Sequence, residues 1–212
     1  MTLPQINLPQ ATPQRAWDLY VPIVTNGSTT RAFITEVIEE PSYYNELCFR
    51  LLVAEPHETF YLHINTPGGL IDSATMIIDA IRQSPAKVIA YLAGSVVSAG
   101  TVITMACDDI IVAPHTSFMI HNYSGRSSGK GHELRALQEH TDKSLNAAFS
   151  EFYTGFLTAK EMREVIDGKD MWMSTDEVLE RWARKKAQAT GTLDASDELP
   201  TTTTRRGRPR KA

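Results

Sequence analysis

A serine, a histidine and several aspartates lie at the ends of apolar segments in this chain, where together they could perform nucleophilic catalysis. Ser98 stands in the small-residue segment GSVVSAG, directly before an apolar run with helical character. A serine at that point meets free backbone N–H groups and the positive end of the helix dipole, which stabilise an oxyanion. Ser98 suits this role better than Ser95, although on its own it also fits a simple helix N-cap.

A nucleophilic serine needs a base that accepts its proton and a carboxylate that orients the base. His121 follows the apolar residues Phe118 to Ile120, where a histidine is either a satisfied core residue or an aimed general base. Asp170 lies in a polar turn before large apolar residues that could bury it, and Asp167 is a close rival. Spacing alone does not decide between the two aspartates.

A second turn of small residues, NTPGG, ends another apolar segment. Glycine lets a backbone approach a substrate closely and leaves backbone N–H groups free. Because both small-residue turns follow apolar strands, both can line one cleft.

Short apolar runs alternate with helical stretches, which predicts an α/β fold with parallel strands. We expect strands at residues 31–38, 60–64, 87–92, 110–113 and 117–121, and helices at 43–54, 73–82, 98–107 and 132–156. The strands are almost wholly apolar, so we expect helices on both faces of the sheet. Two capping boxes, Thr158 with Glu161 and Ser174 with Glu177, predict two further helices.

The chain of 212 residues, 42% hydrophobic and 22% charged, fits one globular domain with appendages. We expect a flexible arm over residues 1–16, the folded domain over 17–187 and a disordered tail over 188–212. A net charge of −4 does not indicate a nucleic-acid-binding domain. The sequence shows no signal-peptide pattern or long apolar segment, so we predict a cytoplasmic protein without a membrane partner, its two cysteines buried and free.

From about residue 18 to residue 187 the chain resembles the proteolytic subunit of the Clp protease (ClpP) family. INTPGG is similar to that family's INSPGG, GSVVSAG to its GQAASMG, SFMIH to its MIH segment and DMWMS to its DRFLS. The resemblance implies a ClpP/crotonase-like α/β spiral of βαβ units with a protruding strand-helix handle. It also implies a serine endopeptidase that cleaves extended or unfolded polypeptides inside an oligomeric chamber.

By this resemblance Ser98 is the nucleophile, His121 the base and Asp170, rather than its rival, the acid. The backbone N–H groups of Gly68 and Ala99 are expected to form the oxyanion hole. The substrate is expected to bind as an added strand, an arrangement that recognises backbone more than side chains. The residues expected to contact that strand are Gly69, Leu70, Asn122, Tyr123, Ser124 and Gly125.

The resemblance implies no metal and no organic cofactor in the subunit, with ATP used only through a separate AAA+ unfoldase. The implied partners are polypeptide substrates and further copies of the chain in one ring or in stacked rings. Two positions depart from the family. Lys169 replaces an arginine that pairs between rings, and His63 replaces an aromatic residue of the clefts that receive the ATPase. Peptidase chemistry is therefore predicted more directly than ring stacking or ATPase docking.

The C-terminal segment RRGRPRK has the form of an AT-hook, in which Arg206, Arg208 and Arg210 would bind weakly in the narrow minor groove of A·T-rich DNA. The alternative is a solvated basic tail. A virus-encoded or otherwise specialised relative would explain such a tail. Three other functions stay open: a crotonase-type acyl-CoA enzyme, a viral capsid-maturation peptidase of the same fold, and a catalytically silent ClpP-like scaffold tethered to DNA. The first has no need of a serine, a histidine and an aspartate together.

Overall fold

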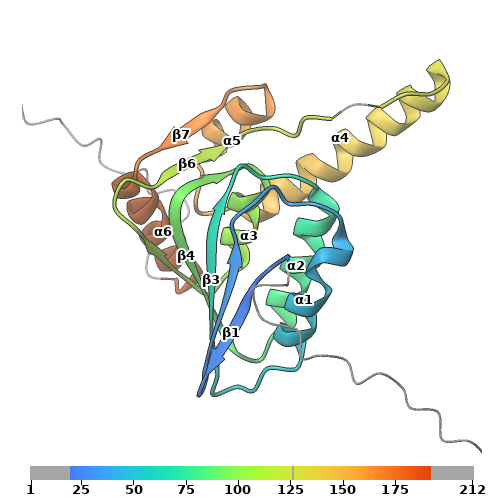
Figure 1. Ribbon diagram of the computed structural model, residues 1–212. Coiled ribbons are helices and arrows are strands. Elements are labelled where there is room, and N and C mark those ends of the chain that lie inside the picture. Colours follow the sequence, from blue (N-terminus) through green and yellow to red (C-terminus); the bar gives the residue numbers. More distant parts are fainter. Residues whose placement is uncertain (1–19, 126, 192–212) are drawn as a thin grey trace, which may run out of the picture.

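The computed structural model describes residues 20–125 and 127–191, which form a seven-stranded mixed sheet with helices packed against it (Figure 1). The strands are β1 (Ile23–Asn26), β2 (Thr29–Ile34), β3 (Thr59–Thr66), β4 (Lys87–Val97), β5 (Asp109–Val112), β6 (Ser117–Ile120) and β7 (Met171–Met173). The helices are η2 (Pro41–Tyr44), α1 (Asn45–Leu52), α2 (Ile71–Gln83), α3 (Ala99–Ala106), α4 (Gly131–Tyr153), α5 (Ala159–Ile166) and α6 (Thr175–Ala189). The predicted α/β fold is confirmed.

The strand order is β1-β2-β3-β4-β6-β7, with β5 paired to β4 outside this path. The pairs β2–β3, β3–β4, β4–β5 and β4–β6 are parallel, and the crossovers between them carry α1, α2 and α3. Two strands were not predicted. The hairpin strand β1 is joined to β2 by the two-residue loop Gly27-Ser28. Gly27 has a φ of 58°, which suits the first position of such a turn, so this Gly-Ser pair is a hairpin signal that the prediction did not use.

The strand β4 runs further than predicted and changes its partner along the way. Residues 89–92 pair with β5, whereas residues 95–97 pair with β6. Gly94 stands where the partner changes, with a φ of 67°, and a Cβ there would lie 2.8 Å from Asn65 Oδ1. The prediction that residues 94–97 belong to a turn was therefore wrong, because β6 supplies them with a hydrogen-bonding neighbour. The extension ends directly at Ser98.

The expectation of helices on both faces of the sheet was only partly right. Helices α1, α2 and α3 cover one face, and α6 lies on the other face beside β5 and β6 (Figure 1). Buried and half-buried residues alternate along β3 and most of β4, so the second face of these strands is partly open. His63 lies on that face, stacked on Phe33 with 4.5 Å between ring centroids and 4.8 Å from the ring of Tyr91.

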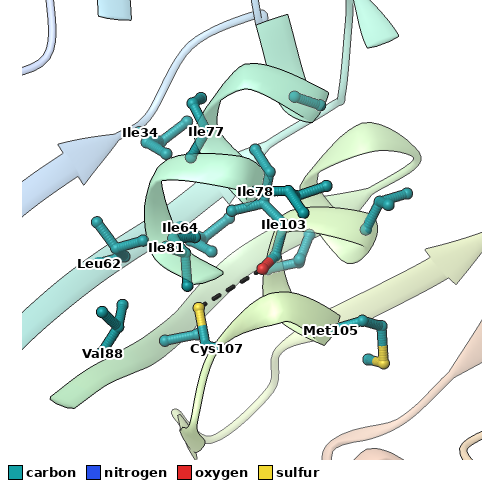
Figure 2. Packing of buried hydrophobic residues seen from close by; sticks show 14 of the residues in the cluster. Ile34, Leu62, Ile64, Ile77, Ile78, Ile81, Val88, Ile103, Met105 and Cys107 are labelled. Atoms are coloured by element: carbon teal, nitrogen blue, oxygen red, sulfur yellow. Dashed lines mark hydrogen bonds between the residues drawn. The ribbon is translucent and has the colours of Figure 1, made fainter. Parts of the chain in front are cut away.

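The core lies between α2 and the sheet (Figure 2). Residues 77, 78 and 81 of α2 share one helix face, as helical periodicity requires, and pack with residues of β2, β3 and β4. Cys107 lies in this core and donates a weak hydrogen bond to the Ile103 carbonyl. Burial raises the pKa of the Cys107 thiol, and it raises that of Cys48 to about 11. Both cysteines are free and buried, as predicted.

The C-terminal part contains both predicted capping boxes, at the starts of α5 and α6. Helix α6 runs to Ala189, so the tail predicted to begin at residue 188 starts at least two residues too early. The strand β7 was not predicted, because three residues show no periodicity. In the described residues no helix is long and apolar enough to span a bilayer. The predicted arm, and Arg206, Arg208 and Arg210 of the basic tail, lie outside the described residues.

The handle consists of α4, which projects from the body, and the described residues 121–125 and 127–130 that precede it (Figure 1). The expected handle strand does not form in the described part of this segment: residues 121–125 and 127–130 lie outside any strand. A strand is defined by a hydrogen-bonded neighbour, and none of the described residues supplies one.

A half-buried ion pair joins α5 to α6 and makes the stability of the fold depend on pH. Arg181 binds both oxygens of Glu161, at 2.7 and 3.0 Å. Burial disfavours the charge of Glu161, but hydrogen bonds from Arg181 and Thr158 outweigh it and lower the pKa of Glu161 to about 2. A depressed pKa stabilises the folded state above the unfolded pKa, so this contribution should disappear as the pH falls from about 4.5 towards 2.

We expect Glu161→Gln to lower the free energy of unfolding at pH 7 by about 2–3 kcal/mol and to flatten its fall in acid, measured by urea unfolding at several pH values. Glutamine still serves a capping box, so the loss reports mainly the ion pair. Glu177→Gln is the control and should cost less, because among the described residues Arg181 hydrogen-bonds Glu161 and not Glu177. Equal acid sensitivity in Glu161→Gln and the wild type would refute this role.

Candidate active site

Ser98 occupies a sharp turn between β4 and α3, with φ 55° and ψ −123°. A positive φ is uncommon for a residue with a side chain and costs on the order of 1–3 kcal/mol, so the surroundings must hold it in place. One such contact is the hydrogen bond from Ser98 N–H to the Met119 carbonyl in β6, at 3.0 Å. The side chain makes no N-cap hydrogen bond. The simple N-cap interpretation therefore fails, and the Ser98 hydroxyl is available for chemistry.

The turn after β3 lies directly against Ser98. Gly68 has a φ of 97°, and a Cβ at this position would lie 2.6 Å from Ser98 Cβ, so only glycine permits this approach. However, Gly68 is buried, and its N–H donates to Thr66 Oγ1 at 3.1 Å. The Gly68 carbonyl accepts from Ile38 N–H at 2.8 Å. Both backbone groups of Gly68 are thus already used within the fold.

The next glycine offers the free donor. Leu70 N–H donates to the Ile38 carbonyl at 2.7 Å, so the groups on both sides of Gly69 point towards Ile38. Backbone groups alternate in extended chain, which turns Gly69 N–H the opposite way. Gly69 lines the cavity beside Ser98, and among the described residues neither Gly69 N–H nor Ala99 N–H has a hydrogen-bond partner. The expectation of a Gly68 donor is therefore corrected in favour of Gly69.

The pairing of β6 with β7 determines which aspartate lies nearest to His121. Ile120 lies opposite Met171 in this antiparallel pair. His121 follows Ile120, and Asp170 precedes Met171, so one further step of the register sets His121 opposite Asp170. Residues directly opposite each other in such a pair have Cβ atoms roughly 4.5–5.5 Å apart. An aspartate at that position can reach the imidazole and orient it.

The rival aspartate lies elsewhere. Asp167 is the C-cap of α5, where its N–H donates to the Arg163 carbonyl at 2.9 Å. The register therefore favours Asp170. The apolar residues after Asp170 do not bury it, contrary to expectation, because Met171 and Met173 turn into the core and leave Asp170 exposed.

A cavity of about 650 Å³ opens beside Ser98 and His121. Its wall includes all six residues that were expected to contact a substrate strand: Gly69, Leu70, Asn122, Tyr123, Ser124 and Gly125. The opposite wall is an apolar stripe of α4 that includes Leu137, Leu145, Ala148, Phe149 and Phe152. Asp170 does not line this cavity. An extended peptide with apolar side chains would fit a groove of this kind.

The three candidate side chains are not joined by hydrogen bonds in the described part of the chain: the Ser98 hydroxyl, the His121 ring and the Asp170 carboxylate make none there. In enzymes without substrate, catalytic hydrogen bonds are often long and tighten when substrate binds. Within residues 20–125 and 127–191 there is also no group of three or more histidine, cysteine, aspartate or glutamate side chains that could hold a metal ion.

Three hydrogen bonds that the sequence did not reveal hold the segment after His121. The Asn122 side chain donates to the Ile166 carbonyl at 2.8 Å, at the end of α5. The Tyr123 hydroxyl donates to Asp142 of α4 and accepts from Gln138 at 2.5 Å. The hydrogen bond to Asp142 raises the pKa of Tyr123, which keeps the phenol protonated. These contacts fix the edge of the cavity, and no local sequence motif predicts them.

Known proteins of one family are similar to this chain. The family model for Clp protease matches residues 23–181. The chain is 30% identical over 135 residues to the ATP-dependent Clp protease proteolytic subunit 2 of Pseudomonas aeruginosa, covering 61% of this chain and 66% of that relative. It is 26% identical over 174 residues to the ATP-dependent Clp protease proteolytic subunit of Streptococcus pneumoniae, covering 79% of this chain and 87% of the relative.

Proposed function

Because this chain belongs to the Clp protease family of serine proteases, we propose that it is an endopeptidase that cleaves extended or unfolded polypeptides through Ser98, His121 and Asp170. The observation that carries the proposal is the strand register. The ends of β4 and β6, and the start of β7, meet at one edge of the sheet beside the cavity. Proteins of this family need no cofactor in the proteolytic subunit.

In the first half of the reaction, Ser98 Oγ forms a bond to the carbonyl carbon of the scissile peptide and gives its proton to His121. The carbonyl oxygen becomes an oxyanion, which accepts hydrogen bonds from the N–H groups of Gly69 and Ala99. His121 then donates the proton to the peptide nitrogen, the C–N bond breaks, and the amine leaves. Asp170 orients the imidazole and stabilises its charged form.

In the second half, a water molecule attacks the acyl-enzyme and gives a proton to His121. The tetrahedral intermediate collapses, the bond from carbon to Ser98 Oγ breaks, and His121 returns the proton to Ser98. A carboxylic acid is released and the free enzyme is restored. Atoms and protons balance without any further co-reactant.

The substrate backbone would lie between the turn at Gly69 and the segment of residues 122–125, adding a strand to both. Backbone hydrogen bonds are the same for every sequence, which favours a broad range of extended substrates. The apolar stripe of α4 supplies the complementary surface for substrate side chains. A folded protein does not offer an unpaired strand, so unfolded chains are the expected substrates.

Proteins of the Clp protease family form oligomeric rings and work with Clp ATPases, and we extend both properties to this chain. Lys169 and His63 affect how closely this chain should match the family in ring stacking and in ATPase binding. Lys169, which stands where the family has an inter-ring arginine, binds Glu164 of its own chain at 2.6 Å. Pairing between rings would have to displace that contact. His63 Nε2 lies 3.2 Å from Arg31 Nη1, which can only donate, so His63 is a neutral acceptor on the open face of the sheet.

The cytoplasmic location and the DNA contact by the basic tail stay predictions from the sequence. A capsid-maturation role would use the same chemistry on one dedicated substrate. A silent scaffold would share the fold without turnover.

The proposal is tested by incubating the purified protein with a fluorogenic peptide, an unfolded protein and an acyl-CoA thioester. We expect the first two to be hydrolysed and the thioester to stay intact. Turnover of the thioester without peptide cleavage would indicate crotonase-type chemistry instead. Turnover of no substrate, including short peptides that need no unfoldase, would support the silent scaffold.

A further inference from the structure

A chain of buried hydroxyl hydrogen bonds connects α4 to the backbone of Ser98. Tyr153, the last residue of α4, is buried, and its hydroxyl lies 2.5 Å from Thr101 Oγ1 in the first turn of α3. Thr101 Oγ1 donates to the Ser98 carbonyl at 2.6 Å. A hydroxyl has one proton to give, so Tyr153 must be the donor to Thr101. The direction of the chain is therefore Tyr153 to Thr101 to Ser98.

The end point of this chain is the strained residue that carries the candidate nucleophile. The Ser98 carbonyl accepts from both the N–H and the hydroxyl of Thr101, and Ser98 N–H is held by Met119. Both peptide groups flanking the Ser98 side chain are thus fixed. A residue at a φ of 55° stays there only if its surroundings determine it from several sides.

The two hydroxyls are not needed to fill space. Thr101 is completely buried and Tyr153 nearly so, and valine and phenylalanine would occupy almost the same volumes. Buried hydrogen bonds in series polarise one another and restrict rotation, which sets the Thr101 rotamer and with it the Ser98 carbonyl. Burial raises the pKa of Tyr153, so this hydroxyl stays a neutral donor.

We propose that Tyr153 and Thr101 are positioning residues for the nucleophile, which hold the Ser98 turn at the angle that aims Oγ into the cavity. The proposal rests on the proposed role of Ser98. It predicts that loss of either hydroxyl lowers the rate of acylation without weakening substrate binding. Tyr153 lines the cavity, but its hydroxyl is already engaged by Thr101 and is not expected to bind the substrate.

The test compares Tyr153→Phe, Thr101→Val and the double variant with the wild type. We expect kcat for a fluorogenic peptide to fall about tenfold in Tyr153→Phe and at least as much in Thr101→Val, with KM changed less than about twofold. The rate of labelling by a fluorophosphonate should fall in parallel. Because the two hydroxyls act in series, the double variant should be no slower than Thr101→Val.

Thr104→Val is the matched control. Thr104 lies one turn further along α3, is equally buried and donates to the Gly100 carbonyl at 2.9 Å, but it does not contact Ser98. We expect Thr104→Val to lose about as much thermal stability as Tyr153→Phe and Thr101→Val, while its kcat stays unchanged. If Tyr153→Phe and Thr101→Val lose stability as Thr104→Val does and keep full kcat, the hydroxyls are merely structural and the proposal is overturned. Wild-type activity that persists in Ser98→Ala would overturn the proposed function instead, which separates the two failures.

Discussion

Replacing Ser98 with alanine should lower kcat for peptide hydrolysis by about 10⁴- to 10⁶-fold. The exchange removes the one atom that forms the acyl bond and leaves the oxyanion donors and the cavity in place. Serine and alanine both carry a Cβ, so the positive φ at this position strains them to a similar degree. The measurement is steady-state hydrolysis of a fluorogenic peptide, with thermal unfolding as the check that the fold is retained.

Ser95→Ala is the control for this variant. Ser95 lies in the same small-residue segment, but it belongs to β4 and its N–H donates to Asn65 Oδ1 at 3.0 Å. It does not line the cavity. Its replacement should change kcat less than about twofold. Full activity in Ser98→Ala, or loss of activity in Ser95→Ala instead, would contradict the assignment of the nucleophile.

Replacing Asp170 with asparagine should lower kcat by about 10³- to 10⁴-fold. An amide at this position can donate a hydrogen bond to the imidazole, which stabilises the wrong tautomer and leaves the charged imidazole uncompensated. Asparagine has nearly the shape of aspartate, and Asp170 is exposed, so the fold should tolerate the exchange.

Asp167→Asn separates the two aspartates that the sequence left as rivals. Asp167 ends α5 and stands outside the β6–β7 register, so its replacement should leave kcat within about twofold of the wild type. The reverse pattern, with Asp167→Asn inactive and Asp170→Asn active, would show that the register does not continue to His121 as inferred.

Local signals in the sequence predicted much of the fold. The capping boxes marked two helices because side chain and backbone satisfy each other within a single turn. The alternation of apolar runs with helical stretches predicted the parallel strands. The helix predicted at residues 132–156 is confirmed as α4, but that its apolar stripe forms one wall of a cavity beside Ser98 depends on how the handle folds back.

Other features of the fold and the site depend on contacts between distant segments and could not be predicted from local sequence. The extension of β4 to Val97 requires β6, and β7 is recognisable only through its pairing with β6. The sequence shows two adjacent glycines, but which N–H is free depends on Thr66 and on Ile38, which lies about thirty positions away. The hydroxyl chain from Tyr153 joins residues that are 52 positions apart.

The residue that a covalent serine-directed inhibitor modifies identifies the nucleophile. The wild-type protein is treated with a fluorophosphonate, which forms a stable adduct with an activated serine, and the modified peptide is identified by mass spectrometry. We expect a single adduct, on Ser98, that is absent from Ser98→Ala and forms slowly in Asp170→Asn. An adduct on another residue, or equal labelling of the wild type and Ser98→Ala, would contradict this expectation.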